Sequence, residues 1–204
     1  TSEDPRSRIE PGWHSSAPKL DLKSWNLSLL RALEWKRFEL VCAAYFEALG
    51  IRTKVAREGA DGGVDIHLYR EDAAKPSAIA QCKAWKVYDV SVKPVRELYG
   101  VMARQGVAEG IFLTTGRFTK EARSFPKGDE LLLWDGEQLL AKIRDLPPEK
   151  QAELLRVATE GDFTTPTCPS CGIKLVQRSP KEGGDAFWGC RNFPRCRIAL
   201  KMSG

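Results

Sequence analysis

The chain has 204 residues, of which 42% are hydrophobic and 29% are charged, and these values are ordinary for a globular protein of one domain with a small appendage. It contains no run of about 20 apolar residues and no signal peptide, which excludes a membrane span within the given sequence. The net charge of +5 resides in the tail, where residues 164–204 hold seven basic and two acidic residues. A basic tail favours a polyanionic partner.

The six cysteines argue against secretion. Four lie between Cys168 and Cys196, whereas Cys42 and Cys82 stand singly inside apolar patterns, as small buried hydrophobic residues do. This placement favours a reducing, cytoplasmic compartment over a disulfide framework. The chain begins at Thr1 rather than at a methionine, which leaves open an N-terminal membrane anchor outside the given sequence.

Hydrophobic periodicity predicts helices and strands that alternate along most of the chain. Residues 1–19, with three prolines, are expected to form a flexible lead-in. The expected helices are a short one near Ser28–Ala32, then Glu34–Leu49, Val90–Gln105, Thr119–Phe125 and Gly136–Ile143. The expected strands are Ile51–Arg57, Val64–Tyr69, Ala78–Trp85, Ala108–Thr115 and Leu131–Trp134. Leu49 and Tyr99 are expected on the inward faces of the two long helices.

The element order predicts an α/β fold, a mixed β-sheet flanked by helices, followed by a small C-terminal four-cysteine unit. We expect the main domain at residues 20–145 and the appendage at residues 167–204. Residues 146–166 contain three prolines around a helical stretch, Glu149–Ala158, and are predicted to form a linker.

Two of the expected strands carry polar residues where a core strand would be apolar. Asp65 follows a glycine pair, and Gln81 and Lys83 are two residues apart, so that they share one face of a strand. Mg²⁺ prefers oxygen ligands, which the Asp65 carboxylate, the Gln81 amide and the backbone carbonyl of Cys82 can supply. Lys83 can orient or deprotonate a water and offset phosphate charge. This set predicts a site for phosphodiester hydrolysis with Mg²⁺ or Mn²⁺.

A glutamate on the expected helix Glu34–Leu49 lies on its apolar stripe. Glu39 is four residues from Trp35 and three from Cys42, and a buried carboxylate is costly unless it is paired or binds a cation. Gln81 contributes no charge to the predicted metal site, so Glu39 can supply the missing negative charge. The alternative is a structural ion pair between Glu39 and a core lysine or arginine, and the residues alone favour neither.

Four sequence blocks in order carry a resemblance to a known family: WKRFE (35–39), DGGVD (61–65), IFLTTGRF (111–118) and LWDG (133–136). Together with Asp65 and Gln81-x-Lys83, they resemble the Mrr-like branch of the PD-(D/E)xK nucleases, in which glutamine replaces the usual acid. The resemblance implies a restriction-endonuclease-like core with metal-dependent DNA cleavage. It also implies active-site roles for Glu39, Asp65, Gln81 and Lys83.

Further polar residues near the predicted strand ends carry weaker signals. Thr115, Arg117 and Lys120 stand where a strand leads into a helix and can bind a phosphate, although a solvated loop explains them equally well. His67 shares the strand face of Asp65, but a surface or capping role is the better interpretation.

The tail carries four cysteines in two close pairs, Cys168 with Cys171 and Cys190 with Cys196. Four thiolates at this spacing predict a tetrahedral structural Zn²⁺ site, and so small a segment needs the metal in order to fold. Residues 187–196 resemble the C-terminal zinc ribbons of type IA topoisomerases, which implies DNA binding, often of single strands. Aromatic and basic residues suited to stacking and phosphate contact are interleaved there: Trp188, Phe193, Arg191, Arg195 and Arg197. Packing beneath the cysteines is the alternative for the aromatic residues.

The sequence therefore predicts a metal-dependent DNA endonuclease, acting in restriction or DNA processing, whose zinc ribbon holds DNA. The alternative is a catalytically inactive nuclease fold that binds or senses DNA, and in a third interpretation the ribbon docks a protein. Cleavage of both strands normally needs two active sites, which leaves a homodimer open.

Overall fold

The structure is a computed structural model that describes residues 20–56, 63–71, 73–84, 89–180 and 183–202. The expected lead-in, Arg57 and the Asp61–Gly62 part of the DGGVD block lie outside these residues. The helices are α1 (Leu27–Ala32), α2 (Trp35–Ala48), α3 (Val92–Gln105), α4 (Lys120–Arg123), α5 (Gly136–Arg144) and α6 (Pro148–Thr159). The strands are β1 (Arg52–Val55), β2 (Ile66–Tyr69), β3 (Ala78–Lys83), β4 (Glu109–Thr114), β5 (Leu131–Trp134), β6 (Val176–Arg178), β7 (Phe187–Gly189) and β8 (Ala199–Lys201).

The first five strands form one mixed sheet in the order β1-β2-β3-β4-β5. The β1–β2 and β2–β3 pairs are antiparallel, whereas β4 lies parallel to both β3 and β5. The change of direction follows from the connections. A short segment joins β2 to β3, and helix α3 crosses over between β3 and β4, as parallel pairing requires. The predicted mixed α/β sheet is confirmed.

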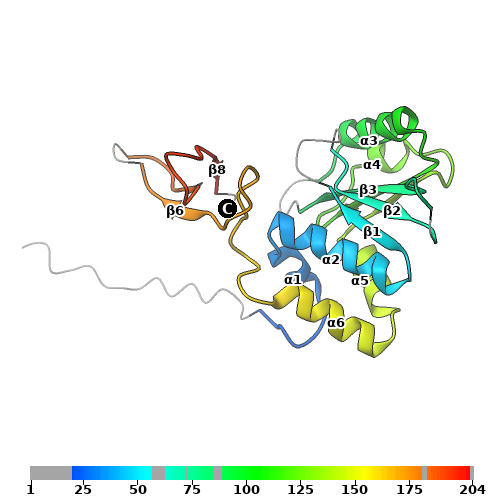
Figure 1. Cartoon of the computed structure of the whole chain (residues 1–204), viewed down its shortest axis with the longest axis horizontal. Helices are drawn as coiled ribbons and strands as arrows, with labels where there is room; N and C mark the ends of the chain where they lie inside the picture. The colour runs from blue at the N-terminus through cyan, green and yellow to red at the C-terminus, as the bar shows by residue number, and fades with distance from the viewer. Residues whose placement is uncertain (1–19, 57–62, 72, 85–88, 181–182, 203–204) are drawn as a thin grey trace, which may run out of the picture.

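Helices cover both faces of this sheet (Figure 1). One face packs against α1, α2, α5 and α6 around a large apolar core, and the other packs against α3 and α4 around a smaller one. Alternation along β3 divides its side chains between the two cores, with Ala80 and Cys82 facing α2 and Ile79 facing α3. Gln81 and Lys83 consequently extend to the α3 side of the sheet.

Two details differ from the sequence expectation for the long helices. Leu49 is 50% exposed because helix α2 ends at Ala48, so this residue no longer follows the helical phase. Tyr99 is 43% exposed and contacts Phe125 edge-on, with ring centroids 5.7 Å apart, at the rim between α3 and α4.

The helix expected within the linker packs against the main domain. Leu154 and Ala158 of α6 are buried in the core that α2 shares with the sheet. The segment before α1 closes the same side: the Trp25 indole Nε1 donates to the Gln151 carbonyl at 3.0 Å, and Arg144 Nη2 donates to the Trp25 carbonyl at 2.9 Å. Residues 20–33 and α6 are therefore held together by buried contacts.

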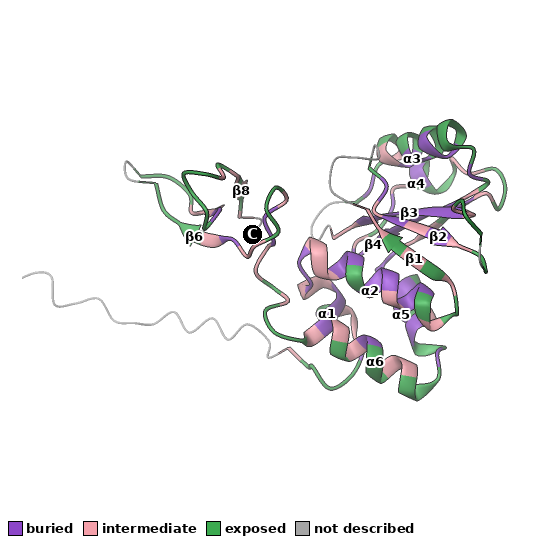
Figure 2. Cartoon of the chain, viewed as in Figure 1, coloured by how far each residue is buried: buried purple, intermediate pink, exposed green. Residues whose placement is uncertain are grey.

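The tail forms a separate three-stranded antiparallel sheet in the order β6-β7-β8. Its small core consists of Cys168, Leu175 and Cys190, with Trp188, Ile198 and Leu200 partly buried around them. Figure 2 shows that buried residues gather in the five-stranded sheet and the inner faces of its helices, while most of the tail is intermediate or exposed. Among the described residues, no helix has both the length and the apolar character needed to cross a bilayer.

Candidate active site and zinc cluster

Asp65 is held against β3 immediately before β2 begins. Its backbone N–H donates to the Ala80 carbonyl at 2.9 Å, and its Oδ2 accepts the Cys82 N–H at 2.6 Å. These two contacts bracket Gln81. Burial raises the pKa of Asp65 above its ordinary value, while the Cys82 hydrogen bond and the charges of Lys83 and Lys36 partly offset the rise. The carboxylate is thus placed among cations in a partly desolvated position.

Gln81 is buried beside this carboxylate with only 6% of its surface exposed. Among the described residues, its Oε1 atom has no hydrogen-bond partner, which is unusual for a buried polar atom and invites a ligand or a water. Its Nε2 lies against Gly63, whose φ is +96°, and a Cβ at that glycine would stand 3.0 Å from Nε2. A glycine is therefore needed there both for its φ and for space.

Lys83 ends β3, and the neighbouring strand β4 fixes its backbone. Its carbonyl accepts Thr114 Oγ1 at 2.9 Å and the Thr115 N–H at 3.2 Å. Both threonines are fully buried, so the side chain of Thr115, predicted as a DNA contact, does not reach the surface. The Lys83 side chain is only partly buried, and its charge acts on Asp65.

Glu39 approaches from α2, which covers the other face of the sheet. It is 6% exposed, and its Oε2 accepts a hydrogen bond from Lys36 Nζ at 2.7 Å. Burial raises the pKa of the Cys82 thiol well above its ordinary value, and the charges of Asp65 and Glu39 add to that rise. Glu39, Lys36 and Asp65 are thus electrostatically coupled around the end of β3.

Lys36 is a site residue that the sequence reasoning missed. It bonds Glu39, and its charge partly offsets the rise in the pKa of Asp65 that burial causes. Lys36 therefore forms the expected structural ion pair and also lies near the candidate metal site. The signal was present in its three-residue spacing from Glu39 on a helix.

The donors around the end of β3 fit a hard divalent cation. They are the Asp65 carboxylate, the Gln81 Oε1, which has no partner among the described residues, and the Cys82 carbonyl. This carbonyl points to the same side of β3 as the Cys82 N–H that Asp65 accepts. Oxygen donors of this kind are the ligands that Mg²⁺ and Mn²⁺ take. Glu39 lies on the α2 side of the sheet, and its charge acts on Cys82 at the end of β3.

The four tail cysteines form a compact cluster. Their Sγ atoms all lie within 4.8 Å of one another, with Cys168 and Cys196 at 3.7 Å and Cys171 and Cys190 at 3.4 Å. Tetrahedral Zn–S bonds of about 2.3 Å place sulfurs about 3.8 Å apart, so the cluster is consistent with structural zinc.

Backbone and side-chain amides support these sulfurs. The Asn192 N–H donates to Cys190 Sγ at 3.4 Å, and Asn192 Nδ2 donates to Cys171 Sγ at 3.7 Å. Within the cluster, a hydrogen bond from the Ile198 amide lowers the pKa of the Cys196 thiol to about 7, whereas desolvation raises the pKa of Cys190 to about 12. Such outer hydrogen bonds orient metal ligands.

The predicted DNA contacts of the tail lie mostly on its surface. Arg191, Arg195 and Arg197 are exposed, and Phe193 is 62% exposed, whereas Trp188 packs against the small core. In the main domain, Lys120 is exposed and Arg117 pairs with Glu137 at 3.6 Å on the surface. The structure therefore leaves Phe193 and the basic residues accessible, and it divides the two tail aromatics between surface and core.

The zinc ribbon is tied to the first turn of α2 through Glu34, whose side chain is 3% exposed. Its carboxylate accepts the Lys36 and Arg37 backbone N–H groups, capping the helix, and also the Thr167 N–H, Thr167 Oγ1 and Lys174 Nζ at 2.9–3.1 Å. The Trp35 indole Nε1 donates to the Thr167 carbonyl at 2.9 Å. We call this set the Glu34 junction.

Comparisons with known proteins agree with this two-part organisation. Residues 30–143 match the family model of the Mrr catalytic domain, described as "Restriction endonuclease". Residues 165–203 match the family described as "Topoisomerase DNA binding C4 zinc finger". The fold and the two sites define a restriction-endonuclease-like domain followed by a topoisomerase-type C4 zinc ribbon. Because the first match covers more than half of the residues, the chain belongs to the Mrr-type restriction endonuclease family.

Individual relatives match parts of the chain. The type IV methyl-directed restriction enzyme EcoKMrr of Escherichia coli (strain K12) is 30% identical over 127 residues, which cover 59% of this chain and 41% of that enzyme. DNA topoisomerase 1 of Mycoplasma pneumoniae is 40% identical over 47 residues, which cover 23% of this chain and 7% of that protein. The structure of the MspJI restriction endonuclease with a 27-mer oligonucleotide shares 23% identity at a TM-score of 0.42, covering 65% of this chain and 34% of that one. The chain thus spans less than half the length of these relatives.

Proposed function

We propose that the protein is a metal-dependent DNA endonuclease with Glu39, Asp65, Gln81 and Lys83 in its active site. The observation that carries this proposal is the buried, unpartnered Oε1 of Gln81 beside the Asp65 carboxylate, as seen among the described residues. A purely structural glutamine would have its oxygen satisfied, whereas a ligand for a divalent cation keeps that oxygen available. Membership of the restriction endonuclease family supports the same reaction.

The residues of the proposed active site have separate roles in phosphodiester hydrolysis. Asp65, Gln81 Oε1 and the Cys82 carbonyl would hold Mg²⁺ or Mn²⁺, and Glu39 would complete the charge around it. When bound, the cation stabilises negative charge on the phosphate and lowers the pKa of a bound water. Lys83 orients the attacking water and offsets charge on the phosphate as the bond to one ester oxygen breaks.

The ribbon supports DNA binding by the whole chain. A structural Zn²⁺ on the four cysteines would order a surface with Arg191, Arg195, Arg197 and the exposed Phe193. Such a surface suits phosphate contact and base stacking, and its resemblance to topoisomerase ribbons favours single-stranded DNA as one partner.

Cleavage assays with Mg²⁺ or Mn²⁺ on plasmid, linear and methylated DNA test the proposal. Asp65→Ala and Lys83→Ala should each lower the cleavage rate by about 10²–10⁴-fold, while the controls Asp129→Ala and Lys150→Ala, outside the candidate site, should cut like the wild type. Intact DNA under all conditions with undiminished, salt-dependent DNA binding would favour the rival, an inactive nuclease fold that binds or senses DNA.

A further inference from the structure

A basic pocket opens on the sheet face that carries Asp65. It has a volume of about 780 Å³, within the range of about 300–1,000 Å³ typical of small-molecule sites. Its described lining comes from β1, β2, the segment before β3 and the turn after α3, with polar side chains from Lys54, His67, Tyr69, Lys75 and Gln105. None of its described lining residues is acidic.

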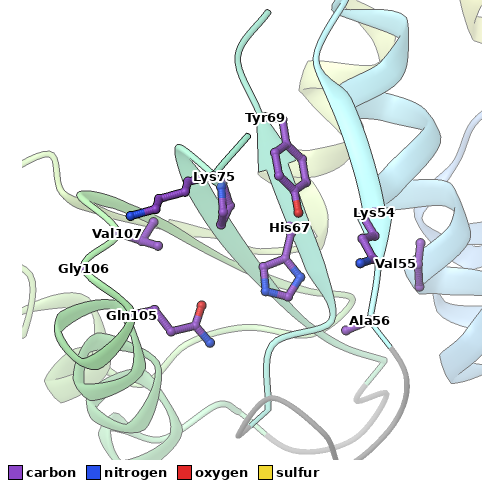
Figure 3. A pocket seen from close by; sticks show the side chains of 10 residues that line it. Lys54, Val55, Ala56, His67, Tyr69, Lys75, Gln105, Gly106 and Val107 are labelled. Carbon is purple, nitrogen blue, oxygen red and sulfur yellow. The ribbon is translucent and has the colours of Figure 1, made fainter. Parts of the chain in front are cut away.

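The polar side chains of the pocket come from separate elements. In Figure 3 the His67 ring lies near the centre, Lys54 stands beside it on β1, and the Tyr69 hydroxyl points toward it. Lys54 and His67 are direct partners in the β1–β2 ladder, which keeps them adjacent on one face. Gln105 extends from the end of α3 on the opposite wall, whereas the Lys75 side chain extends away from His67, toward Val107. Two lysines, an imidazole, a hydroxyl and an amide form a donor set for an anion.

The pocket continues the candidate active site along β2. Asp65 and His67 are two residues apart on the same face, which corresponds to about 7 Å of strand, and Tyr69 is about another 7 Å along. A DNA strand whose phosphate lies at Asp65 would therefore bring a neighbouring nucleotide to the pocket. We propose that the pocket holds this flanking nucleotide, with its phosphate on Lys54 and His67. The identity of the ligand rests on the proposed function.

Binding can be measured apart from cleavage. The chain has only two histidines, His14 and His67, so the imidazole proton resonances are few and His67→Gln assigns them. An Asp65→Asn protein without added Mg²⁺ is titrated with a twelve-residue oligothymidylate, and the His67 resonance should shift and saturate. Lys54→Ala with Lys75→Ala should weaken binding at least about tenfold and remove the shift. The control pair Lys23→Ala and Lys150→Ala, on the α1–α6 side, should retain both.

Three outcomes would overturn the assignment. The first is a His67 resonance that stays unmoved, and the second is a Lys54/Lys75 variant that binds the oligonucleotide like its control. The third is a shift with thymidine monophosphate that the oligonucleotide does not displace, because the pocket would then serve free nucleotides. Loss of cleavage alone bears on the proposed function, since this experiment needs no cleavage.

A second inference rests on the independent contacts of the Glu34 junction. Thr167 immediately precedes the ligand Cys168, and it bonds the carboxylate that caps α2, the helix of Lys36 and Glu39. Lys174 joins the same carboxylate and also donates to the Thr165 carbonyl at 2.8 Å. We infer that a metal-loaded ribbon orders the first turn of α2 through this junction. Glu34 would then be a positioning residue for Lys36 and Glu39.

Hydrogen exchange at the Lys36 and Arg37 amides reports this coupling directly, since both N–H groups are bonded to Glu34. Removing zinc from the full chain, without Mg²⁺ or DNA, should speed their exchange about tenfold or more. Thr167→Val with Lys174→Met should speed it similarly in the zinc-loaded protein, because the cap then loses its ribbon partners. Lys201→Met, an exposed ribbon lysine, is the matched control. Unchanged exchange at these amides after zinc removal, or in the double variant, would refute the coupling.

Discussion

At the residue scale, the candidate active site places an acid where burial opposes its charge. Asp65 has a raised pKa in the folded protein, mainly from desolvation. For such a group, the stabilising contribution is fully present below the unfolded-state pKa and is lost as the pH rises through the folded-state pKa. At neutral pH the ionised carboxylate therefore costs stability that a bound cation would restore.

This predicts that Asp65→Asn raises the stability of the metal-free protein although it should lower cleavage. Without Mg²⁺ the variant should melt at a higher temperature than the wild type at pH 7, and the difference should vanish below about pH 4, near the ordinary pKa of the residue. Mg²⁺ should raise the melting temperature of the wild type alone. Thermal melts across pH check this, with the exposed Asp129→Asn as control. A variant less stable at pH 7 would contradict it.

Gly63 offers a second prediction, because its positive φ and its contact with Gln81 can be separated. Gly63→Ala should cost about 1–3 kcal/mol through backbone strain and should also displace Gln81, lowering Mg²⁺-dependent cleavage. Gly50→Ala provides the control, since its φ of +80° is also positive but a Cβ there meets nothing within 4 Å. Chemical denaturation should show a similar loss of stability in both variants. Cleavage assays should show a loss of activity in Gly63→Ala alone. Equal activities would count against a role for Gln81.

The residues of the candidate site were predictable from sequence to different degrees. The spacing of Gln81 and Lys83 on one strand fixes their common face, so their proximity to Asp65 could be expected. The ion pair between Lys36 and Glu39 could have been predicted from their three-residue spacing on a helix. The burial of Thr115 could not, since the end of an apolar strand looks the same whether its last side chain turns inward or outward.

At the element scale, α6 shows how a helix can belong to a core that lies mostly earlier in the chain. Leu154→Ala should destabilise the main domain by about 2–5 kcal/mol, because this side chain is 2% exposed in the core shared with α2. Leu40→Ala on α2, where the leucine is 40% exposed, should cost much less. Urea denaturation of both variants compares them. Equal urea-denaturation midpoints for the two variants would contradict a contribution of α6 to the core.

Periodicity located most helices and strands to within a few residues, because each long element keeps one apolar face. It did not predict that α6 packs on α2, since the prolines on both sides of that helix are also typical of a linker. Tyr99 was misplaced for a related reason: a large aromatic residue at a helix rim can cover a neighbour and stay half exposed.

At the scale of the whole molecule, the formal excess of positive charge falls in residues 164–204, which form the ribbon, while the rest of the chain is neutral overall. Replacing Arg191, Arg195 and Arg197 by alanine should weaken DNA binding and flatten its dependence on salt. The slope of log affinity against log salt should fall by about 0.9 for each phosphate of duplex DNA that the variant no longer neutralises. Zinc content confirms that the variant is folded, and Lys23→Ala with Lys150→Ala serves as control. Unaltered affinity would favour a protein partner for the ribbon.

The two-part organisation was visible in the sequence because cysteine spacing and the charge of the tail both change near residue 165. The Glu34 junction was not, since the pairing of residue 34 with residues 167 and 174 leaves no periodic pattern. Only the folded chain shows that a glutamate at the start of α2 receives the base of the ribbon.

The Glu34 junction also sets a length. It anchors the ribbon at the N-cap of α2, five residues before Glu39, so DNA held by the ribbon would meet the candidate active site at a constant offset. A protein built in this way would cut at a fixed number of nucleotides from the position that it grips, whatever the sequence between them. The junction would then fix the distance between the DNA held by the ribbon and the candidate active site.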